Sequence, residues 1–246
     1  MSKVASFKPP YIDVPDIDSY FGGKGGSGVY QAIINQIPPH NAFVSGFLGH
    51  CAILRMKRPA SLNIGIDISS RVVSAWQKAI LHGPMKRLEV LEGDFLAINP
   101  SVWDYKSSFL YLDPPYPMEV RKSSRDRYDY ELSYMEHEIL LNKILDAKCM
   151  VAISSYANPL YDDRLKDWRY IDFTAQTRRG VAIERLYMNY DEPDELHDYS
   201  YLGDDYKDRE RIKLKFQRWV ANFDGLSIQE QNMRIDFLNS TKFKTA

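Results

Sequence analysis

The sequence predicts an α/β protein built on a mainly parallel β-sheet. Short apolar runs bounded by turn residues alternate along the chain with segments of helical periodicity. The chain has 246 residues, of which 44% are hydrophobic, enough for one good-sized core or a core plus an appendage. Strands and helices that take turns in this way favour a sheet covered by helices on both faces.

The first half of the chain supplies most of the predicted elements. Strands are predicted over residues 41–46, 62–67, 87–94 and 108–113, and a helix over 50–57. A second helix follows Ser69 and Ser70, either of which can cap it. Helical spacing predicts that its inner face carries Val72, Val73, Trp76 and Ile80.

The second half opens with a capping box, Ser133 and Glu136, which predicts the start of a helix. This helix runs through Ile139, Leu140, Ile144 and Leu145. A strand over 149–156 follows it. Two further strands, over 168–175 and 182–190, complete the series and are expected to form a hairpin.

Composition then changes sharply. Residues 191–205 contain seven acidic residues and no Lys or Arg, whereas 206–219 contain six basic residues and two acidic ones. Ser227 and Glu230 form another capping box before a last helix. We therefore predict two domains: residues 1–192 carry the sheet, and 193–246 form an acidic linker with C-terminal helices. In the basic helix, Ile212, Phe216 and Trp219 are expected to pack inward.

Bulk properties narrow the class of protein. The formal net charge is −1, so any nucleic-acid surface must be local. Two cysteines are too few for a disulfide framework and favour a reducing compartment. The N-terminus lacks an apolar signal region, and no run of eighteen apolar residues is present. We expect a soluble cytoplasmic protein with no membrane partner, monomeric by default.

Three strand ends carry residues suited to a nucleoside-bearing ligand. Gly46 and Gly49 lie in the turn after the first strand, where a ligand could approach the backbone, although a plain tight turn is an equal alternative. Asp67 ends the second strand, as a partner for two ribose hydroxyls or as a helix N-cap. After the third strand, Asp94 can accept from an amino group and Phe95 can cover a flat ring.

The fourth strand ends in the motif Asp113-Pro114-Pro115-Tyr116. Two prolines fix the backbone and remove two N–H donors. A planar amino group could donate one hydrogen to the Asp113 side chain and another to the Pro114 carbonyl, while Tyr116 stacks on its ring. The motif indicates a seat for an aromatic amine that acts as a nucleophile; a Pro-Pro turn with an N-cap aspartate is the structural alternative.

Together these motifs give the chain its resemblance to a known family. YFGGK (20–24), FVSGFLG (43–49), GID (65–67), GDF (93–95) and LDPPY (112–116) follow in that order. The order resembles the Dam-type family of DNA adenine methyltransferases, its phage and prophage members in particular, over about residues 18 to 240. The resemblance implies a Rossmann-like seven-stranded methyltransferase sheet, mainly parallel with a C-terminal antiparallel hairpin, plus a small C-terminal helical extension. It also implies S-adenosylmethionine as cofactor and the exocyclic amino group of adenine as target.

The resemblance assigns roles to the matched residues. The residues implied to hold the target base are Asp113, Pro114 and Tyr116. Those implied to bind the cofactor are Tyr20, Gly23, Lys24, Phe47, Gly49, Asp67, Asp94 and Phe95. The chain departs from the family at Ser45-Gly46, where Glu-Pro is common, and at Gly49-His50-Cys51, where a glycine-rich run is common.

The implied reaction is direct in-line methyl transfer from sulfur to nitrogen, after the adenine has flipped out of the base stack. Ring-carbon methylation of cytosine is not expected, because it uses a cysteine that usually follows proline, and neither Cys51 nor Cys149 does so. No metal is expected, because the histidines lack ligand spacing: His40, His50, His82, His137 and His197.

Double-stranded DNA is the expected partner. The candidates for phosphate contact are Arg121, Lys122, Arg125, Arg127, Arg178 and Arg179, with the basic helix over 206–219 as a third region. A solvated surface is the alternative for each region. Asp113 follows Asp94 by only 19 residues, which is too few for the long recognition insertion of strict Dam-type enzymes. We therefore predict a short or relaxed recognition sequence.

Two other readings stay open at this point. The same chemistry could act on RNA, on the amino group of cytosine or on a protein glutamine. Alternatively, the chain could be a degenerate methyltransferase fold that binds DNA or a partner protein, a reading that the altered turn at Ser45-Gly46 supports and the intact Asp67, Asp94 and Asp113 oppose.

Overall fold

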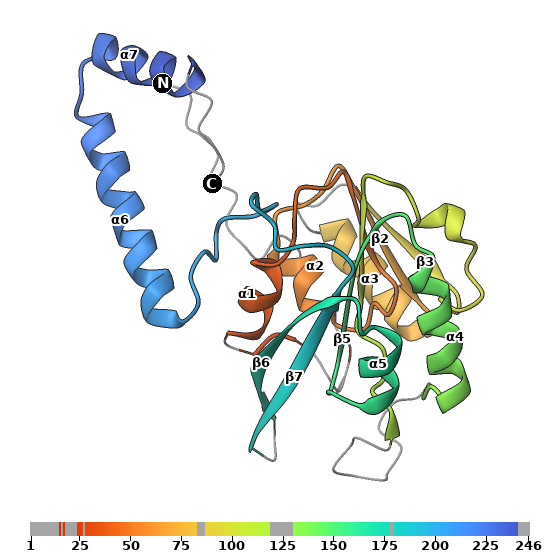
Figure 1. Cartoon of the computed structure of the whole chain (residues 1–246). Coiled ribbons are helices and arrows are strands. Elements are labelled where there is room, and N and C mark those ends of the chain that lie inside the picture. Colours follow the sequence, from red (N-terminus) through yellow and green to blue (C-terminus); the bar gives the residue numbers. More distant parts are fainter. Residues whose placement is uncertain are drawn as a thin grey trace. The chain divides into compact units, whose positions relative to one another are not determined.

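The computed structural model describes residues 15, 17, 24–26, 28–82, 87–118, 130–177 and 180–240, without the side chains of residues 81, 82, 176 and 177. Figure 1 labels the elements. The strands are β1 Ala42–Ser45, β2 Leu62–Asp67, β3 Leu88–Glu92, β4 Ser108–Leu112, β5 Met150–Ser155, β6 Arg169–Thr177 and β7 Gly180–Met188. The helices are α1 Val29–Ile34, α2 Ala52–Met56, α3 Ser70–His82, the 3-10 helix η1 Pro100–Val102, α4 Tyr134–Leu145, α5 Pro159–Arg164, α6 Tyr206–Asp224 and α7 Ile228–Ser240.

All seven strands belong to one sheet, in the order β3-β2-β1-β4-β5-β7-β6. The first five strands of the chain pair in parallel, whereas β7 runs antiparallel to both β5 and β6. The predicted α/β fold, with a mainly parallel sheet and a C-terminal antiparallel hairpin, is confirmed. Each strand that the sequence predicted is present.

One edge of the sheet gathers the ends of the parallel strands, and we call it the carboxyl edge. Ser45, the last residue of β1, pairs with Gly65 of β2 and with Tyr111 of β4. Farther along, Arg185 of β7 pairs with Ser155, the last residue of β5. Because β7 is antiparallel, the residues just before Arg185 continue past the end of β5. The carboxyl edge therefore receives side chains from β7 as well.

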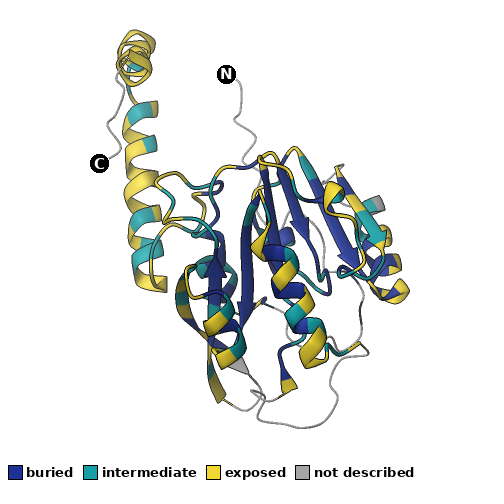
Figure 2. Cartoon of the chain, turned by 45° about the vertical axis from the view of Figure 1, so that its right-hand side comes forward, coloured by how far each residue is buried: buried dark blue, intermediate teal, exposed yellow. Residues whose placement is uncertain are grey.

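The central strands are buried beneath helices (Figure 2). Every residue of β1 and β4 is buried, as expected for strands in the middle of a parallel sheet. Leu140 and Ile144 of α4 belong to one apolar cluster with Val44, Leu110 and Val151 of the strands. This core fixes the ends of β1, β4 and β5, and with them the residues that follow each strand.

Helices α3 and α4 begin and bury residues largely as their sequences predict. α3 buries three of the four residues expected on its inner face, Val72, Val73 and Trp76, while the fourth, Ile80, is half-buried. α4 begins at the predicted capping box, in which the Ser133 hydroxyl accepts from the Glu136 N–H and the Glu136 carboxylate accepts from the Ser133 N–H. Both helices are confirmed.

The chain divides into two compact units, residues 1–198 and 199–246, which we call the sheet unit and the helical unit. In the helical unit, α6 begins at Asp205, whose carboxylate accepts from the Asp208 N–H. α7 begins at the predicted capping box of Ser227 and Glu230. The two C-terminal helices that the sequence predicted are therefore present.

The inward packing predicted for Ile212, Phe216 and Trp219 is wrong. Phe216 is 62% exposed and Trp219 is 48% exposed, and no residue of α6 or α7 is buried. An amphipathic helix buries its apolar side only against another layer of structure. The described part of the helical unit offers two helices and no such layer, so the apolar residues remain at the surface.

Candidate active site at the carboxyl edge of the sheet

Asp113 lies directly after β4 and is the centre of a polar cluster. Its Oδ1 atom accepts a hydrogen bond from the Ser154 hydroxyl of neighbouring β5 at 2.8 Å. The same oxygen lies 2.7 Å from the Lys24 ammonium nitrogen, which comes from a turn 89 residues earlier in the chain. The apolar run of β4 ends here because the next side chain is a carboxylate that needs polar partners.

Glu184 completes this cluster from β7. One of its carboxylate oxygens accepts from the Tyr116 hydroxyl at 2.7 Å and lies 3.3 Å from the Lys24 ammonium. The Lys24 ammonium also lies 5.0 Å from the centre of the Tyr116 ring. We call Lys24, Asp113, Tyr116, Ser154 and Glu184 the Asp113 cluster. It joins side chains from two strands, the Asp-Pro-Pro-Tyr segment and the turn at Lys24.

The Asp113 cluster is largely withdrawn from water. Lys24 is 4% exposed, Glu184 6% and Tyr116 7%. Burial raises the pKa of the Asp113 carboxyl; the Lys24 ammonium opposes this shift and the Glu184 carboxylate adds to it. Burial and the two carboxylates raise the pKa of Tyr116 well above its usual range, so its hydroxyl stays protonated and donates to Glu184.

Asp67 ends β2 on the same edge. Its two carboxylate oxygens accept from backbone N–H groups, Oδ2 from Gly49 at 2.8 Å and Oδ1 from Ser69 at 2.9 Å. Burial raises the pKa of this carboxyl, and the two N–H groups oppose the shift. Asp67 thus ties the turn after β1 to the start of α3. A carboxylate has about four acceptor positions, and these two bonds use two of them.

The turn after β1 has structural reasons for its glycines. Gly49 has a φ of +40°, in the region that favours glycine, and its carbonyl accepts from the Trp76 indole at 2.7 Å. A Cβ at Gly46 would lie 2.4 Å from the Leu112 side chain and 2.8 Å from that of Phe95. Gly46 therefore allows the end of β1 to pack closely on the core.

The remaining predicted residues lie beside this turn. The ring centres of Phe47 and Phe95 are 5.7 Å apart, and Phe95 is a core residue with 2% exposure. Asp94 is half-buried and its Oδ1 accepts from the Leu96 N–H. Asp94 lies two residues beyond Glu92, which pairs with Asp67. The structure thus places Phe47, Gly49, Asp67, Asp94 and Phe95 at or after the ends of β1, β2 and β3. The Asp113 cluster lies at the ends of β4 and β5, with Glu184 of β7, along the same carboxyl edge.

Several predicted site residues lie outside the described part of the chain. For the cofactor these are Tyr20 and Gly23, and for DNA they are Arg121, Lys122, Arg125, Arg127, Arg178 and Arg179. Pro114 is buried within the Asp-Pro-Pro-Tyr segment. All of these roles stay predictions.

Glu184 and Ser154 were missed by the sequence analysis. The sequence did contain a signal for Glu184, a carboxylate within the predicted strand segment AIERLYM. A glutamate is seldom buried unless it is paired, so this position could have been predicted to contact a cation or a hydrogen-bond donor. Ser154 had no such signal, because a serine in a buried strand is common. Its position follows only from the pairing of β5 with β4.

The two residues that replace the family's glycine-rich run have local partners. His50 Nε2 lies 3.3 Å from the Pro15 carbonyl oxygen, and the Cys51 sulfur accepts from the Leu54 N–H at the start of α2. Burial raises the pKa of the Cys51 thiol, which disfavours the reactive thiolate.

Among the described residues, no group of three or more His, Cys, Asp or Glu side chains could hold a metal ion. In the same part of the chain, none of the helices is both long and apolar enough to span a bilayer.

Comparisons with known proteins give a similar fold and no family. No protein-family model and no curated protein matches the chain. Among solved structures, it is similar to the 23S rRNA methyltransferase ErmE at 13% identity, over 68% of this chain and 69% of that one, with a TM-score of 0.46. It is also similar to precorrin 8W decarboxylase of Methanobacterium thermoautotrophicum (12% identity, 75% and 96% covered, TM-score 0.45) and to a dimethyladenosine transferase from Plasmodium falciparum (14% identity, 65% and 60% covered, TM-score 0.44). These proteins are named for different reactions and each TM-score is below 0.5, so neither the activity nor the substrate of this chain is inferred from them.

Proposed function

We propose that this chain is an S-adenosylmethionine-dependent methyltransferase that acts on the exocyclic amino group of adenine in DNA. The observation that carries the proposal is the Asp113 carboxylate, which lies half-buried directly after β4 and accepts a hydrogen bond from an amine nitrogen, that of Lys24, at 2.7 Å. A carboxylate that holds an amine in this way can also hold an aromatic amino group. Asp67, whose carboxylate accepts from two backbone N–H groups, ends β2 on the same edge.

The residues of this chain have positioning and electrostatic roles in the proposed reaction. When bound, the cofactor supplies a methyl group activated by a sulfonium sulfur. Asp113 and the Pro114 carbonyl each accept one hydrogen of the target amine, which fixes the nitrogen and turns its lone pair toward the methyl group. Tyr116 packs on the ring of a base that has left the stack. Asp67 accepts from the ribose hydroxyls of the cofactor.

Methyl acceptance tests this proposal directly. Labelled S-adenosylmethionine is offered with duplex DNA, single-stranded DNA or RNA, and the products are digested to nucleosides. We expect label on the amino group of adenine from duplex DNA. Label on RNA or on cytosine would replace the proposed substrate, and failure to bind S-adenosylmethionine in calorimetry would contradict the proposed enzyme class.

The proposed recognition sequence is short or relaxed, because Asp113 follows Asp94 by only 19 residues and η1 is the one element between β3 and β4. Methylation sequencing of DNA from a host that expresses the chain gives the measurement. A single fully methylated motif of about four or more base pairs would contradict this part of the proposal.

A further inference from the structure

Lys24 lies where the target amine would have to lie. Its ammonium nitrogen is 2.7 Å from Asp113 Oδ1, within hydrogen-bond distance of the carboxylate proposed to hold the amine. The same nitrogen is 5.0 Å from the centre of the Tyr116 ring, on which the target base would pack. One side chain of the protein therefore occupies two of the contacts proposed for the substrate, those to Asp113 and Tyr116.

We propose that Lys24 is a placeholder for the target amine and that Glu184 is the positioning residue that receives its ammonium when the amine enters. The inference rests on the proposed function, because it takes Asp113 as the amine seat. Glu184 is suited to this role since its carboxylate already lies 3.3 Å from the Lys24 ammonium. A small rotation of the lysine side chain can move the contact from one carboxylate to the other.

Charge balance explains why a second carboxylate is needed. Lys24 is 4% exposed, so water does not solvate its ammonium in the described position. An ammonium displaced from Asp113 therefore needs another partner inside the cluster. A neutral aromatic amine that takes its place on Asp113 brings no positive charge. Glu184 is the second carboxylate that lies beside the Lys24 ammonium, and an ion pair with it offsets part of the cost of keeping this charge away from water. Glu184 lowers the free energy of the exchange.

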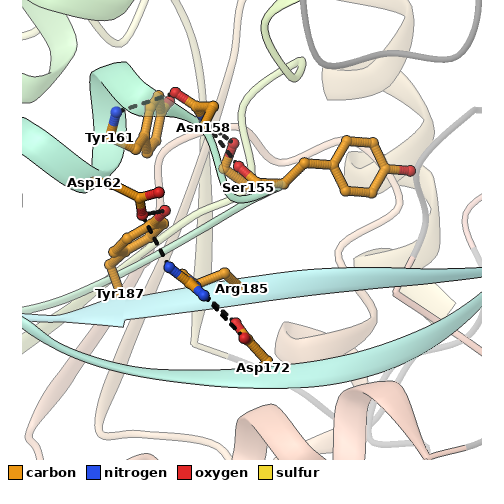
Figure 3. Close-up of polar contacts among 8 residues, drawn as sticks. Ser155, Asn158, Tyr161, Asp162, Asp172, Arg185 and Tyr187 are labelled. Atoms are coloured by element: carbon orange, nitrogen blue, oxygen red, sulfur yellow. Dashed lines mark hydrogen bonds and ion pairs between the residues drawn. The ribbon is translucent and has the colours of Figure 1, made fainter.

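Glu184 is held firmly by the other side of β7. The next residue, Arg185, donates to both carboxylate oxygens of Asp172 on β6 and to Asp162 of α5, and Tyr187 donates to the same Asp162 (Figure 3). These contacts tie β7 to β6 and to α5. Because neighbouring residues of a strand point to opposite faces, this network supports the backbone at Glu184 without entering the Asp113 cluster.

The groups that face Asp113 give the inference a pH signature. They are Lys24, Glu184, Ser154, Tyr111, Tyr116, Tyr161 and Cys51. The Glu184 carboxylate raises the pKa of Asp113 and the Lys24 ammonium lowers it. Loss of the Glu184 charge should move the acidic limb of the pH–rate profile to lower pH, and loss of the Lys24 charge should move it to higher pH. These shifts follow from the charges beside Asp113 alone, so they test its electrostatic partners, and nucleoside binding tests the exchange itself.

Nucleoside binding to the full chain tests the placeholder. Calorimetry at mildly alkaline pH, chosen because the pKa of Asp113 is raised, measures the affinity for 2′-deoxyadenosine, a probe that carries the amine and no phosphate. Purine 2′-deoxyriboside, which differs only in lacking the amino group, is the matched control ligand. We expect Lys24→Met to bind deoxyadenosine about tenfold more tightly than the wild type, because the amine no longer has to displace an ammonium. Purine 2′-deoxyriboside should gain about threefold at most.

Two variants of the hairpin test the role of Glu184. Glu184→Gln keeps the shape and an acceptor for Tyr116 but removes the charge, and we expect about tenfold weaker deoxyadenosine binding. Asp172→Asn removes a carboxylate from the opposite face of the same hairpin, and we expect a change below about twofold. Weaker binding by Lys24→Met than by the wild type would overturn the placeholder. Equal behaviour of the Glu184 and Asp172 variants would overturn the role of Glu184.

These readouts separate the inference from the proposed function. Nucleoside binding requires neither cofactor nor methyl transfer. If the wild type and the variants bind deoxyadenosine in the expected order but the wild type transfers no methyl group, the proposed function is contradicted. The role of Asp113 as the amine seat would then still stand. A wild type that methylates DNA while Lys24→Met loses affinity for deoxyadenosine would contradict the placeholder alone.

Discussion

The sheet unit and the helical unit each contain a helix that begins at the same kind of cap, but only the helix of the sheet unit buries residues. α4 and α7 both start at a Ser–Glu capping box, with serine N–H to glutamate distances of 2.7 Å and 2.9 Å. α4 buries Leu140 and Leu141 against the sheet, whereas α7 buries nothing. Figure 2 shows the contrast in the exposed surface of each helix. A cap decides where a helix begins, and a neighbouring layer decides what it buries.

Charged residues follow the same contrast. In the sheet unit, Asp113 is half-buried beside Lys24, Glu184 and Ser154, each of which alters its pKa. In the helical unit, Asp208 pairs with Arg211 one turn along an exposed helix. Water screens the second pair and hardly reaches the first. Matched substitutions in the two units should therefore differ widely in effect.

The largest difference is expected for the two aspartates. Asp113→Ala should lower methyl transfer by about 10³-fold or more, since it removes the group that holds the amine. Its affinity for S-adenosylmethionine should change by about threefold at most. Asp208→Ala should change transfer by less than about twofold. Methyl-transfer kinetics and calorimetry give both quantities, and an Asp113→Ala enzyme with unaltered transfer would refute its role.

Two tryptophans give the next comparison. Trp76 of α3 is fully buried and donates to the Gly49 carbonyl, whereas Trp219 of α6 is 48% exposed. Trp76→Ala should lower the free energy of unfolding by about 3–5 kcal/mol, and Trp219→Ala by no more than about 0.5 kcal/mol. Urea denaturation measures both. A loss of about 2 kcal/mol or more for Trp219→Ala would mean that its ring is covered in solution.

A pH dependence should distinguish the units as well. Burial, followed by the charge of Lys57, lowers the pKa of His40 from 6.5 to about 2 and that of His197 to about 4. Both rings are neutral in the folded protein and become protonated on unfolding below pH 6.5, so protons favour the unfolded state. The contribution of these two rings to stability is therefore complete above pH 6.5 and falls with decreasing pH, by up to about 2.7 kcal/mol per pH unit for the two groups.

Thermal unfolding between about pH 7 and pH 5 measures this slope. His40→Phe keeps a ring beside Phe43 and Phe109 and should reduce the slope by about half. The helical unit contains no histidine, so its helicity should stay constant over the same range. A His40→Phe variant with the wild-type slope would exclude His40 as a source of the acid sensitivity.

The smallest expected effect concerns the two caps. Ser133→Ala and Ser227→Ala should each cost about 1 kcal/mol of local helix stability. In the sheet unit the loss should appear in the global unfolding transition, because α4 is part of the core. In the helical unit it should appear only as reduced helicity in circular dichroism. A shift of the sheet unit's Tm by Ser227→Ala would show that the two units unfold together.

Much of the sheet unit could be predicted from local sequence. Strands such as LNIGID and SFLYL are short apolar runs between turn residues, and their period and length differ from those of helices. The Asp-Pro-Pro-Tyr motif located the candidate site for two reasons. The prolines restrict the backbone of the segment, and the Asp113 carboxylate at the end of an apolar strand must find polar partners. The inward packing predicted for Phe216 and Trp219 failed because periodicity shows which side of a helix is apolar and not whether anything covers it.

By itself, the sequence determined the alternation of strands and helices, the capped starts of α4 and α7, and the position of Asp113 at a strand end. These features depend on contacts between residues a few positions apart. Only the tertiary structure decided that Lys24 reaches Asp113 from 89 residues away and that Glu184 meets Tyr116 from 68 residues away. The reason is physical: β7 lies antiparallel beside β5, and this pairing depends on long-range register that no local pattern encodes.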